Sequence, residues 1–137
     1  MLGIIALFVA AACESKPEER AAVINLVNDT RIAHGLKPLE ENVQLDMKAD
    51  DWAVHLRNIC DLEHSHLADG APGNWLKLGE NVGYGGDIAQ VHDAYLNSPG
   101  HRANILDASY TSMGAAAVWG NCDGWHRVFT VQVFMKS

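Results

Sequence analysis

The chain has little positive charge and lacks several common catalytic and nucleotide-binding motifs. Its 137 residues include 10 Lys and Arg against 17 Asp and Glu, which gives a formal net charge of −7. The basic residues are scattered, so no phosphate-binding stripe is present and nucleic acid is excluded as an expected partner. HExxH, GxxxxGK[ST], CxxC and GxSxG are absent as well, which excludes the sites that these motifs mark.

Cysteine is scarce, and the first of the three cysteines ends an apolar run. Residues 1–13 resemble the apolar core of a secretory signal and are too short to span a bilayer, which takes about 20 residues. Residues 9–13 (VAAAC) resemble a bacterial lipobox, so we expect a signal peptide ending in a lipidated Cys13. This predicts an exported protein, extracellular or anchored as a lipoprotein, that meets the membrane only through Cys13. No Lys or Arg precedes the run, and a short buried helix is the alternative.

Export determines how the other two cysteines are interpreted. In an oxidising compartment Cys60 and Cys122 are expected to form a disulfide. In the cytosol the same two residues would be buried free thiols. No flanking signature supports a nucleophilic role for either of them.

Hydrophobic periodicity predicts three helices in the first two thirds of the chain. A capping-box pattern at 15–18 begins the first helix, which ends at Gly35. Apolar residues at helical spacing predict the second helix over 45–59 and the third over 87–96. The polar residues of the second helix are expected off its core face: Asp46, Lys48, Asp50 and Asp51.

The rest of the chain predicts a long loop and a hairpin. Residues 61–86 hold six glycines without periodicity, which indicates an irregular and functional loop. Extended runs at 113–119 and 129–134 flank turn residues 120–124, which predicts a β-hairpin. Helices followed by strands favour an α+β fold in one domain. We expect this domain over 20–137, preceded by a short tether at 14–19.

Four titratable residues in or after the irregular stretch are candidates for chemistry: His64, His66, Glu80 and His101. Histidine suits proton transfer or metal binding because its ordinary pKa is near neutrality. A glutamate beside it can orient the ring, ligate a metal or activate water. A structural role stays open, in which the histidines are solvated or simply hydrogen-bonded to Glu80.

Three short segments form a specific pattern: 62–65 (LEHS), 79–85 (GENVGYG) and 98–106 (SPGHRANIL). They resemble the signatures of the CAP superfamily, the cysteine-rich secretory, antigen and pathogenesis-related proteins, and the chain is similar to the bacterial SCP-like branch. With the opening and the closing strand, the resemblance covers roughly residues 20–135. It implies a three-layer α–β–α sandwich with a small antiparallel sheet, and a shallow cleft of histidines and acids.

Within this resemblance, His64 fits the first histidine, with His66 as the alternative, and Glu80 fits the acid of the GEN motif. The second glutamate of the family corresponds to Ser98 and is therefore missing. His101 is the available second histidine. The resemblance thus implies a ligand-binding cleft of His64, Glu80 and His101, in which the two histidines bind Zn²⁺ or another divalent metal.

Four other polar residues are expected to have structural roles. Arg102 and Asn104 are interpreted as scaffold, because they can bind loop carbonyls. Asn81 is expected to hold the glycine-rich segment together. His92 is expected to be a partly buried histidine on the third helix.

Three hypotheses on function stay open. The first is a monomeric, non-catalytic module at the cell surface that binds a metal and a small or lipid-like ligand. The second is a hydrolase in which Glu80, with His64 and His101, activates metal-bound water on a peptide or envelope substrate. The third is a surface domain with a vestigial cleft, whose loops bind a protein partner.

Overall fold

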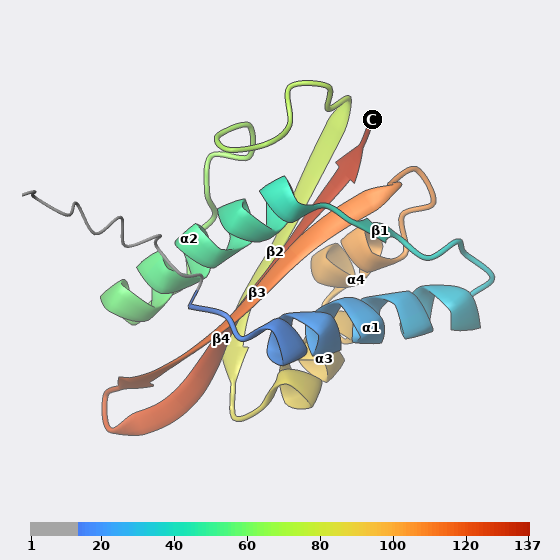
Figure 1. Ribbon diagram of the computed structural model, residues 1–137. Coiled ribbons are helices and arrows are strands. Elements are labelled where there is room, and N and C mark those ends of the chain that lie inside the picture. The colour runs from blue at the N-terminus through green and yellow to red at the C-terminus, as the bar shows by residue number, and fades with distance from the viewer. Residues whose placement is uncertain (1–13) are drawn as a thin grey trace, which may run out of the picture.

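A computed structural model describes residues 14–137 and has the predicted α+β fold in three layers (Figure 1). Residues 1–13, with the predicted lipidation site Cys13, lie outside the described part of the chain. The described elements are α1 (Pro17–Ala33), β1 (Glu40–Glu41), α2 (Val43–Ile59), β2 (Lys77–Gly85), α3 (Ile88–Leu96), α4 (Pro99–Ile105), β3 (Ser112–Cys122) and β4 (Trp125–Lys136). None of these helices combines the length and apolar character that crossing a bilayer requires.

The sheet has the strand order β1-β3-β4-β2. The hairpin of β3 and β4 forms its centre, and β2 pairs antiparallel with β4 on one side. The predicted hairpin is thus present, and its strands are longer than expected. The two-residue β1 adds a short parallel pair to β3, so the sheet is antiparallel except at this edge.

Apolar side chains alternate between the two faces of the sheet, so each face has its own core. Helix α2 covers one face, and α1, α3 and α4 cover the other (Figure 1). In β3, Ala115 and Ala117 face the three-helix layer, whereas Ala116 and Val118 face α2. Small side chains in the central strand let the helices on both faces approach closely.

The first helix begins without the predicted capping box. Lys16 is the N-cap residue and makes no capping hydrogen bond through its side chain. The Ser15 hydroxyl instead accepts a hydrogen bond from the Ala117 N–H at the edge of β3 (2.9 Å). The capping-box prediction is wrong because a buried strand edge needs an acceptor for its unpaired N–H groups, and Ser15 supplies one.

The second helix has the predicted apolar face, but most of its polar face is buried too. The exposed fractions of Asp46, Lys48 and Asp50 are 3%, 8% and 5%. Asp46 accepts a hydrogen bond from the Ala115 N–H, and Asp50 accepts one from the Ser15 N–H. These residues were expected off the core face. Asp46 and Asp50 are buried because β3 and the chain start pack against them, and Lys48 is buried because the loop after α2 folds over it.

The segment 61–86 is not one loop, because its second half forms β2. Residues 77–85 pair with β4 along their whole length. The glycines within β2 serve close packing: a Cβ at Gly79 would collide with the Tyr110 hydroxyl, and one at Gly83 with the Tyr95 ring. Glycine in a strand interior can mark such a close approach, and composition alone does not distinguish it from loop glycine.

The predicted disulfide is confirmed. Cys60 and Cys122 are bonded and join the end of α2 to the end of β3, across 62 residues of sequence. Cys60 is the C-cap of α2 and has a left-handed backbone with φ of 52°. The disulfide therefore fastens the end of α2 to the turn end of the hairpin.

Candidate functional site

Glu80, in β2, has a nearly inaccessible carboxylate, with a side-chain exposure of 1%. Its Oε1 accepts a hydrogen bond from the Ser65 N–H (2.9 Å) and contacts His64 Nδ1 (2.9 Å). Its Oε2 accepts a hydrogen bond from the Ser65 hydroxyl. Both carboxylate oxygens are therefore occupied by the loop that follows α2.

His64 extends from this loop, and its side chain is 63% exposed. Because a carboxylate accepts the hydrogen bond at Nδ1, that nitrogen carries the proton in the neutral ring. The lone pair of Nε2 is then available to a ligand. The neighbouring His66 contributes its backbone carbonyl to Lys48, and its ring makes no hydrogen bond to Glu80.

His101 comes from 98–106, which we interpreted as a turn followed by scaffold. The segment forms helix α4, with Pro99 in its first turn, where proline is tolerated in a helix. The His101 ring packs against Tyr95 with centroids 5.0 Å apart. Burial and the nearby His64 both lower the pKa of His101, which favours its neutral, metal-ligating form near pH 7.

Two amides, of the buried Asn81 and the half-buried Asn104, clamp α4 onto β2. Asn81 Nδ2 donates to the His101 carbonyl (3.1 Å) and to Gln132 Oε1 (3.0 Å). Asn104 Nδ2 donates to the Glu80 carbonyl (3.2 Å) and to Asn81 Oδ1 (2.9 Å). The amides in GEN and SPGHRANIL thus hold together the two elements that carry Glu80 and His101.

Two contributors to this cluster were not predicted from the sequence. The Lys48 ammonium donates to the Ser65 hydroxyl (3.1 Å) and to the His66 carbonyl (3.0 Å). Burial lowers the pKa of Lys48, and the charge of Glu80 partly opposes this shift. Ser65 has a local signal, since it directly follows His64, but Lys48 lies in a distant helix with no motif around it.

His92 lies outside the cluster and is a buried histidine of α3. Its Nε2 hydrogen-bonds to the Thr30 hydroxyl of α1 (2.9 Å), and burial lowers its pKa. Arg102 is exposed and contacts His34. Neither side chain contacts Glu80. His92 links α3 to α1, and Arg102 links α4 to the end of α1.

The histidine nitrogens are the donors in the cluster that could hold a metal. Within residues 14–137, no three His, Cys, Asp or Glu side chains are grouped as a ready metal site. Glu80 is buried and both of its oxygens accept hydrogen bonds, which leaves the imidazoles of His64 and His101. This donor set suits a borderline metal such as Zn²⁺, with water or ligand atoms completing its coordination.

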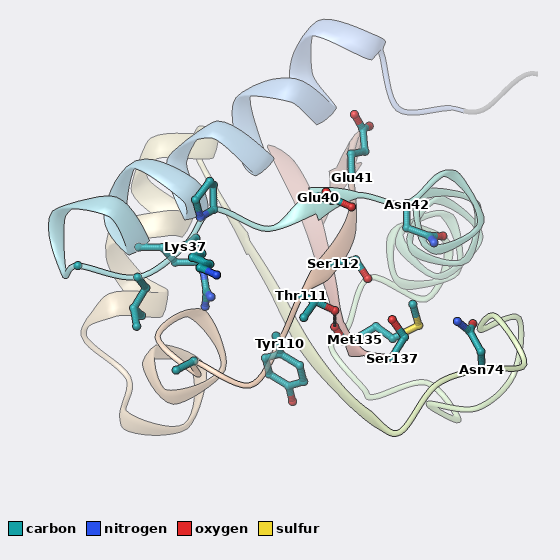
Figure 2. A pocket seen from close by; sticks show the side chains of 15 residues that line it. Lys37, Glu40, Glu41, Asn42, Asn74, Tyr110, Thr111, Ser112, Met135 and Ser137 are labelled. Carbon is teal, nitrogen blue, oxygen red and sulfur yellow. Dashed lines mark hydrogen bonds between the residues drawn. The ribbon is translucent and has the colours of Figure 1, made fainter.

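Three cavities of ligand size occur in the described part of the molecule. The largest, about 760 Å³, lies at the end of the sheet beside β1 (Figure 2). One of about 590 Å³ lies between α1, α3 and Trp119. A third, about 470 Å³, borders Lys48 and Ser65. The second is a shallow hollow, wide open to solvent, and is the most apolar of the three by its lining; the third adjoins the histidine cluster.

The α–β–α sandwich, the His64–Glu80 pair and the clamped α4 together define a CAP-type domain. The family model for CAP, the cysteine-rich secretory protein family, matches residues 24–134. The chain belongs to this family, as the three sequence signatures predicted.

Two curated relatives come from Bacillus subtilis (strain 168). The uncharacterized protein YkwD is 30% identical over 105 residues, which are 70% of this chain and 41% of that protein. The uncharacterized membrane protein YlbC is 27% identical over 124 residues, which are 83% of this chain and 33% of that protein. The chain thus matches less than half the length of either relative.

Solved structures share the fold. An outer surface protein from Borrelia burgdorferi has a TM-score of 0.71 and 19% identity, over 88% of this chain and 93% of that one. An extracellular SCP-domain protein from Bacillus anthracis str. Ames has a TM-score of 0.72 and 24% identity, over 88% of this chain and 41% of that one. At these identities the likeness concerns the fold.

Proposed function

We propose that this chain is the CAP domain of an exported bacterial protein. In this proposal it binds a divalent metal through His64 and His101, takes up a small or lipid-like ligand, and catalyses no reaction. Export is supported by the names of two structural relatives, an outer surface protein and an extracellular protein. Lipidation of Cys13 would hold the domain at the membrane surface and stays a prediction.

The proposal rests on the burial and hydrogen bonding of the Glu80 carboxylate. A general base must reach the water that it deprotonates. Glu80 instead makes three hydrogen-bond contacts through its two oxygens, and its side chain is almost fully buried. Such a carboxylate orients the histidine and raises the basicity of Nε2, which is how carboxylates behind metal-binding histidines act.

A bound divalent metal would supply a Lewis-acid centre that polarises an oxygen or nitrogen atom of the ligand. His64 would hold it through Nε2, with the ring fixed by Glu80. His101 would hold it from α4, with the ring fixed against Tyr95. The second carboxylate of the family is replaced by Ser98, so this chain has no acid and base pair for hydrolysis.

The cavity between α1 and α3 is the best candidate for a lipid-like ligand. Ala22 and Leu26 of α1 line it together with Ile88 of α3 and Trp119 of β3. The Trp119 indole N–H donates to Glu19 Oε1 (2.8 Å), so its polar atom is already paired. One face of the ring stacks on His126, and the apolar surface that remains can contact a hydrocarbon chain.

Zinc titration by calorimetry tests the metal site. We expect His64→Ala and His101→Ala each to abolish binding, because two imidazoles hold the ion. Glu80→Gln should weaken binding by about 10- to 100-fold, as loss of an orienting partner does. His66→Ala is the matched control and should bind like the unchanged protein. Binding that survives both His64→Ala and His101→Ala would contradict the assignment.

Displacement of a fluorescent fatty acid tests the apolar cavity. Ala22→Trp places a bulky ring among the lining residues, so we expect it to abolish fatty acid binding. Ala21→Trp is the matched control, because Ala21 is exposed and does not line the cavity. Equal binding by both variants would place the ligand elsewhere.

The hydrolase and partner-binding hypotheses make different predictions in the same experiments. A hydrolase would turn over peptide or envelope substrates and lose this turnover in Glu80→Gln. A vestigial cleft with a protein partner would bind neither zinc nor fatty acid in the unchanged protein. Either result would replace the proposed function.

A further inference from the structure

The largest cavity lies apart from the histidine cluster and from the apolar cavity. Figure 2 shows it between the loop after α1, the strand β1 and the start of β3. It shares no lining residue with the cluster of His64, Glu80 and His101. Its volume of about 760 Å³ is within the usual range for small-molecule sites, roughly 300–1,000 Å³.

Ser112 at this cavity has a buried hydroxyl without a partner. The residue is 8% exposed, and its Oγ makes no hydrogen bond within the described part of the chain. In Figure 2, Ser112 and Thr111 lie in the middle of the lining residues. A buried hydroxyl without a partner costs about 1–3 kcal/mol. The oxygen is closed to solvent in this conformation, so a ligand in the cavity would complete it after the Ser112 side chain rotates about its Cα–Cβ bond.

The walls of the cavity are held in place before any ligand binds. Arg31 is buried, and its guanidinium donates to the carbonyls of Lys37, Ile105 and Asp107 at 2.8–2.9 Å. These bonds tie the loop after α1 to the loop after α4, which form two walls. A site with fixed walls loses little conformational entropy on binding.

Neutral amides supply further hydrogen-bonding groups around Ser112. Asn42 caps α2 through Oδ1, which accepts from the Leu45 N–H, so its Nδ2 protons remain available. Asn74, which lies below Asn42 on the right of Figure 2, makes no side-chain hydrogen bond with residues 14–137. An amide both donates and accepts, as does a serine hydroxyl, and so matches a ligand rich in hydroxyl groups.

The charges around the cavity cancel. Lys37 and Arg31 are balanced by Glu40 and Glu41, and the donors of Arg31 are largely used by backbone carbonyls. A phosphorylated or carboxylated ligand would find no surplus of positive charge here. Leu36, Pro38 and Met135 add apolar contact area between the polar groups.

We propose that this cavity binds a short neutral saccharide, with the Ser112 hydroxyl hydrogen-bonded to a sugar oxygen or N-acetyl carbonyl. Asn42 and Asn74 contact further hydroxyl groups, and the apolar side chains contact the C–H faces of the sugar rings. The site is independent of the metal and the lipid-like ligand. It gives the chain a second binding function, directed at a glycan.

Chemical-shift mapping by NMR on the purified full chain tests this site. The probes are maltotriose, triacetylchitotriose and, as a charged comparator, trigalacturonic acid, each at millimolar concentration. We expect one of the neutral probes to shift amide signals around Thr111, Asn42 and Asn74. Comparison of maltotriose with triacetylchitotriose shows whether N-acetyl groups take part in binding. A preference for the charged probe, shifts elsewhere on the surface, or no shifts with any probe would overturn the proposal.

Two comparisons separate effects on saccharide binding from effects on protein stability. Ser112→Ala should weaken binding about tenfold and leave stability unchanged or higher, because it removes an unsatisfied hydroxyl. Ala108→Trp should block the cavity, whereas Ala103→Trp, exposed on α4 and outside the lining, should bind normally. If Ser112→Ala lowers stability and keeps full affinity, the hydroxyl has a structural role and the assignment fails.

Discussion

Buried carboxylates in this chain accept hydrogen bonds from backbone N–H groups that have no strand partner. Asp46 does so for Ala115, Asp50 for Ser15, and Glu80 for Ser65. Such groups must be paired when water is excluded, and a side-chain acceptor can do this where a sheet ends. Each of these three carboxylates therefore has a structural role as an acceptor for the backbone.

Glu80, His64 and His101 could be chosen from the sequence because each lies in a short local motif. Their geometry could not be predicted, because it depends on Asn81, which links α4 to β2 across 20 residues of sequence. Asp46 carried no local signal at all. Its burial follows from the packing of α2 on β3, which the helical pattern does not report.

Asp46 gives the protein a pH-dependent stability. Burial, and to a smaller extent the neighbouring Glu41 carboxyl, raise the pKa of Asp46 from 3.8 to about 7, and the Ala115 N–H and Arg20 oppose this shift. The folded protein therefore keeps a proton that the unfolded chain releases between about pH 4 and pH 7, so stability falls as the pH rises. Asp46→Asn should remove this loss and stabilise the protein by roughly 2–4 kcal/mol above pH 7. Urea unfolding at about pH 4 and pH 8 measures the difference.

Asp51→Asn is the matched control for this prediction. Asp51 belongs to the same helix, yet it is exposed. Its substitution should change stability by less than about 0.5 kcal/mol at either pH. If Asp46→Asn raises the free energy of unfolding by the same amount at both pH values, Asp46 does not titrate in this range.

At the scale of elements, α1, α2, α3 and the β-hairpin were predicted, and β1, β2 and α4 were not. α1 and α2 are 17 residues each and repeat their apolar pattern several times. β2 contains several glycines and α4 is only 7 residues long, so tertiary contacts determine their conformation. β1 pairs through two residues and depends on β3 for its existence.

The disulfide links two elements that lie far apart in the sequence, α2 and the hairpin. In the chain-entropy account, closing a loop of this length stabilises a protein by about 4 kcal/mol. The double substitution Cys60→Ser and Cys122→Ser should therefore lower the free energy of unfolding by about 2–5 kcal/mol. Urea unfolding measures this change, and reducing agent should destabilise the unchanged protein and leave the variant unaffected.

Cys13→Ser serves as the control for the disulfide variant. Cys13 is expected to carry a lipid and takes no part in the Cys60–Cys122 bond. Its substitution should leave the unfolding curve of the purified chain unchanged. Equal stability of the double variant and the control would show that the disulfide contributes nothing to folding.

At the scale of the whole molecule, the described chain start completes the α2 side of the fold. The Glu14 and Ser15 N–H groups both donate to Asp50, and the Ser15 hydroxyl accepts from Ala117. Glu14 also forms an ion pair with Arg57 (2.7 Å). Residues 14–19 were expected to be a tether, and the first two of them pack against α2 and β3. The folded unit thus reaches to Glu14, directly after the predicted lipid anchor.

Truncation tests where the folded unit begins. A chain that starts at Glu14 keeps every contact described above, so we expect it to unfold like the chain with residues 1–13. A chain that starts at Pro17 leaves Asp50 and the Ala117 N–H without their partners, and burial of such groups costs about 1–3 kcal/mol each. We therefore expect a loss of roughly 2–4 kcal/mol between these two truncations. Urea unfolding of both truncations at one pH gives the comparison.

The substitution Ser15→Ala in the chain that starts at Glu14 separates the two contributions. It removes the acceptor for the Ala117 N–H and keeps the Ser15 N–H that donates to Asp50, so it should reproduce about half of the loss. If both truncations unfold alike, residues 14–16 are a tether and the folded unit begins with α1. If they differ as expected, a lipid at Cys13 would leave a single peptide bond between anchor and domain. The CAP fold would then be held against the membrane with its α2 side nearest the lipid.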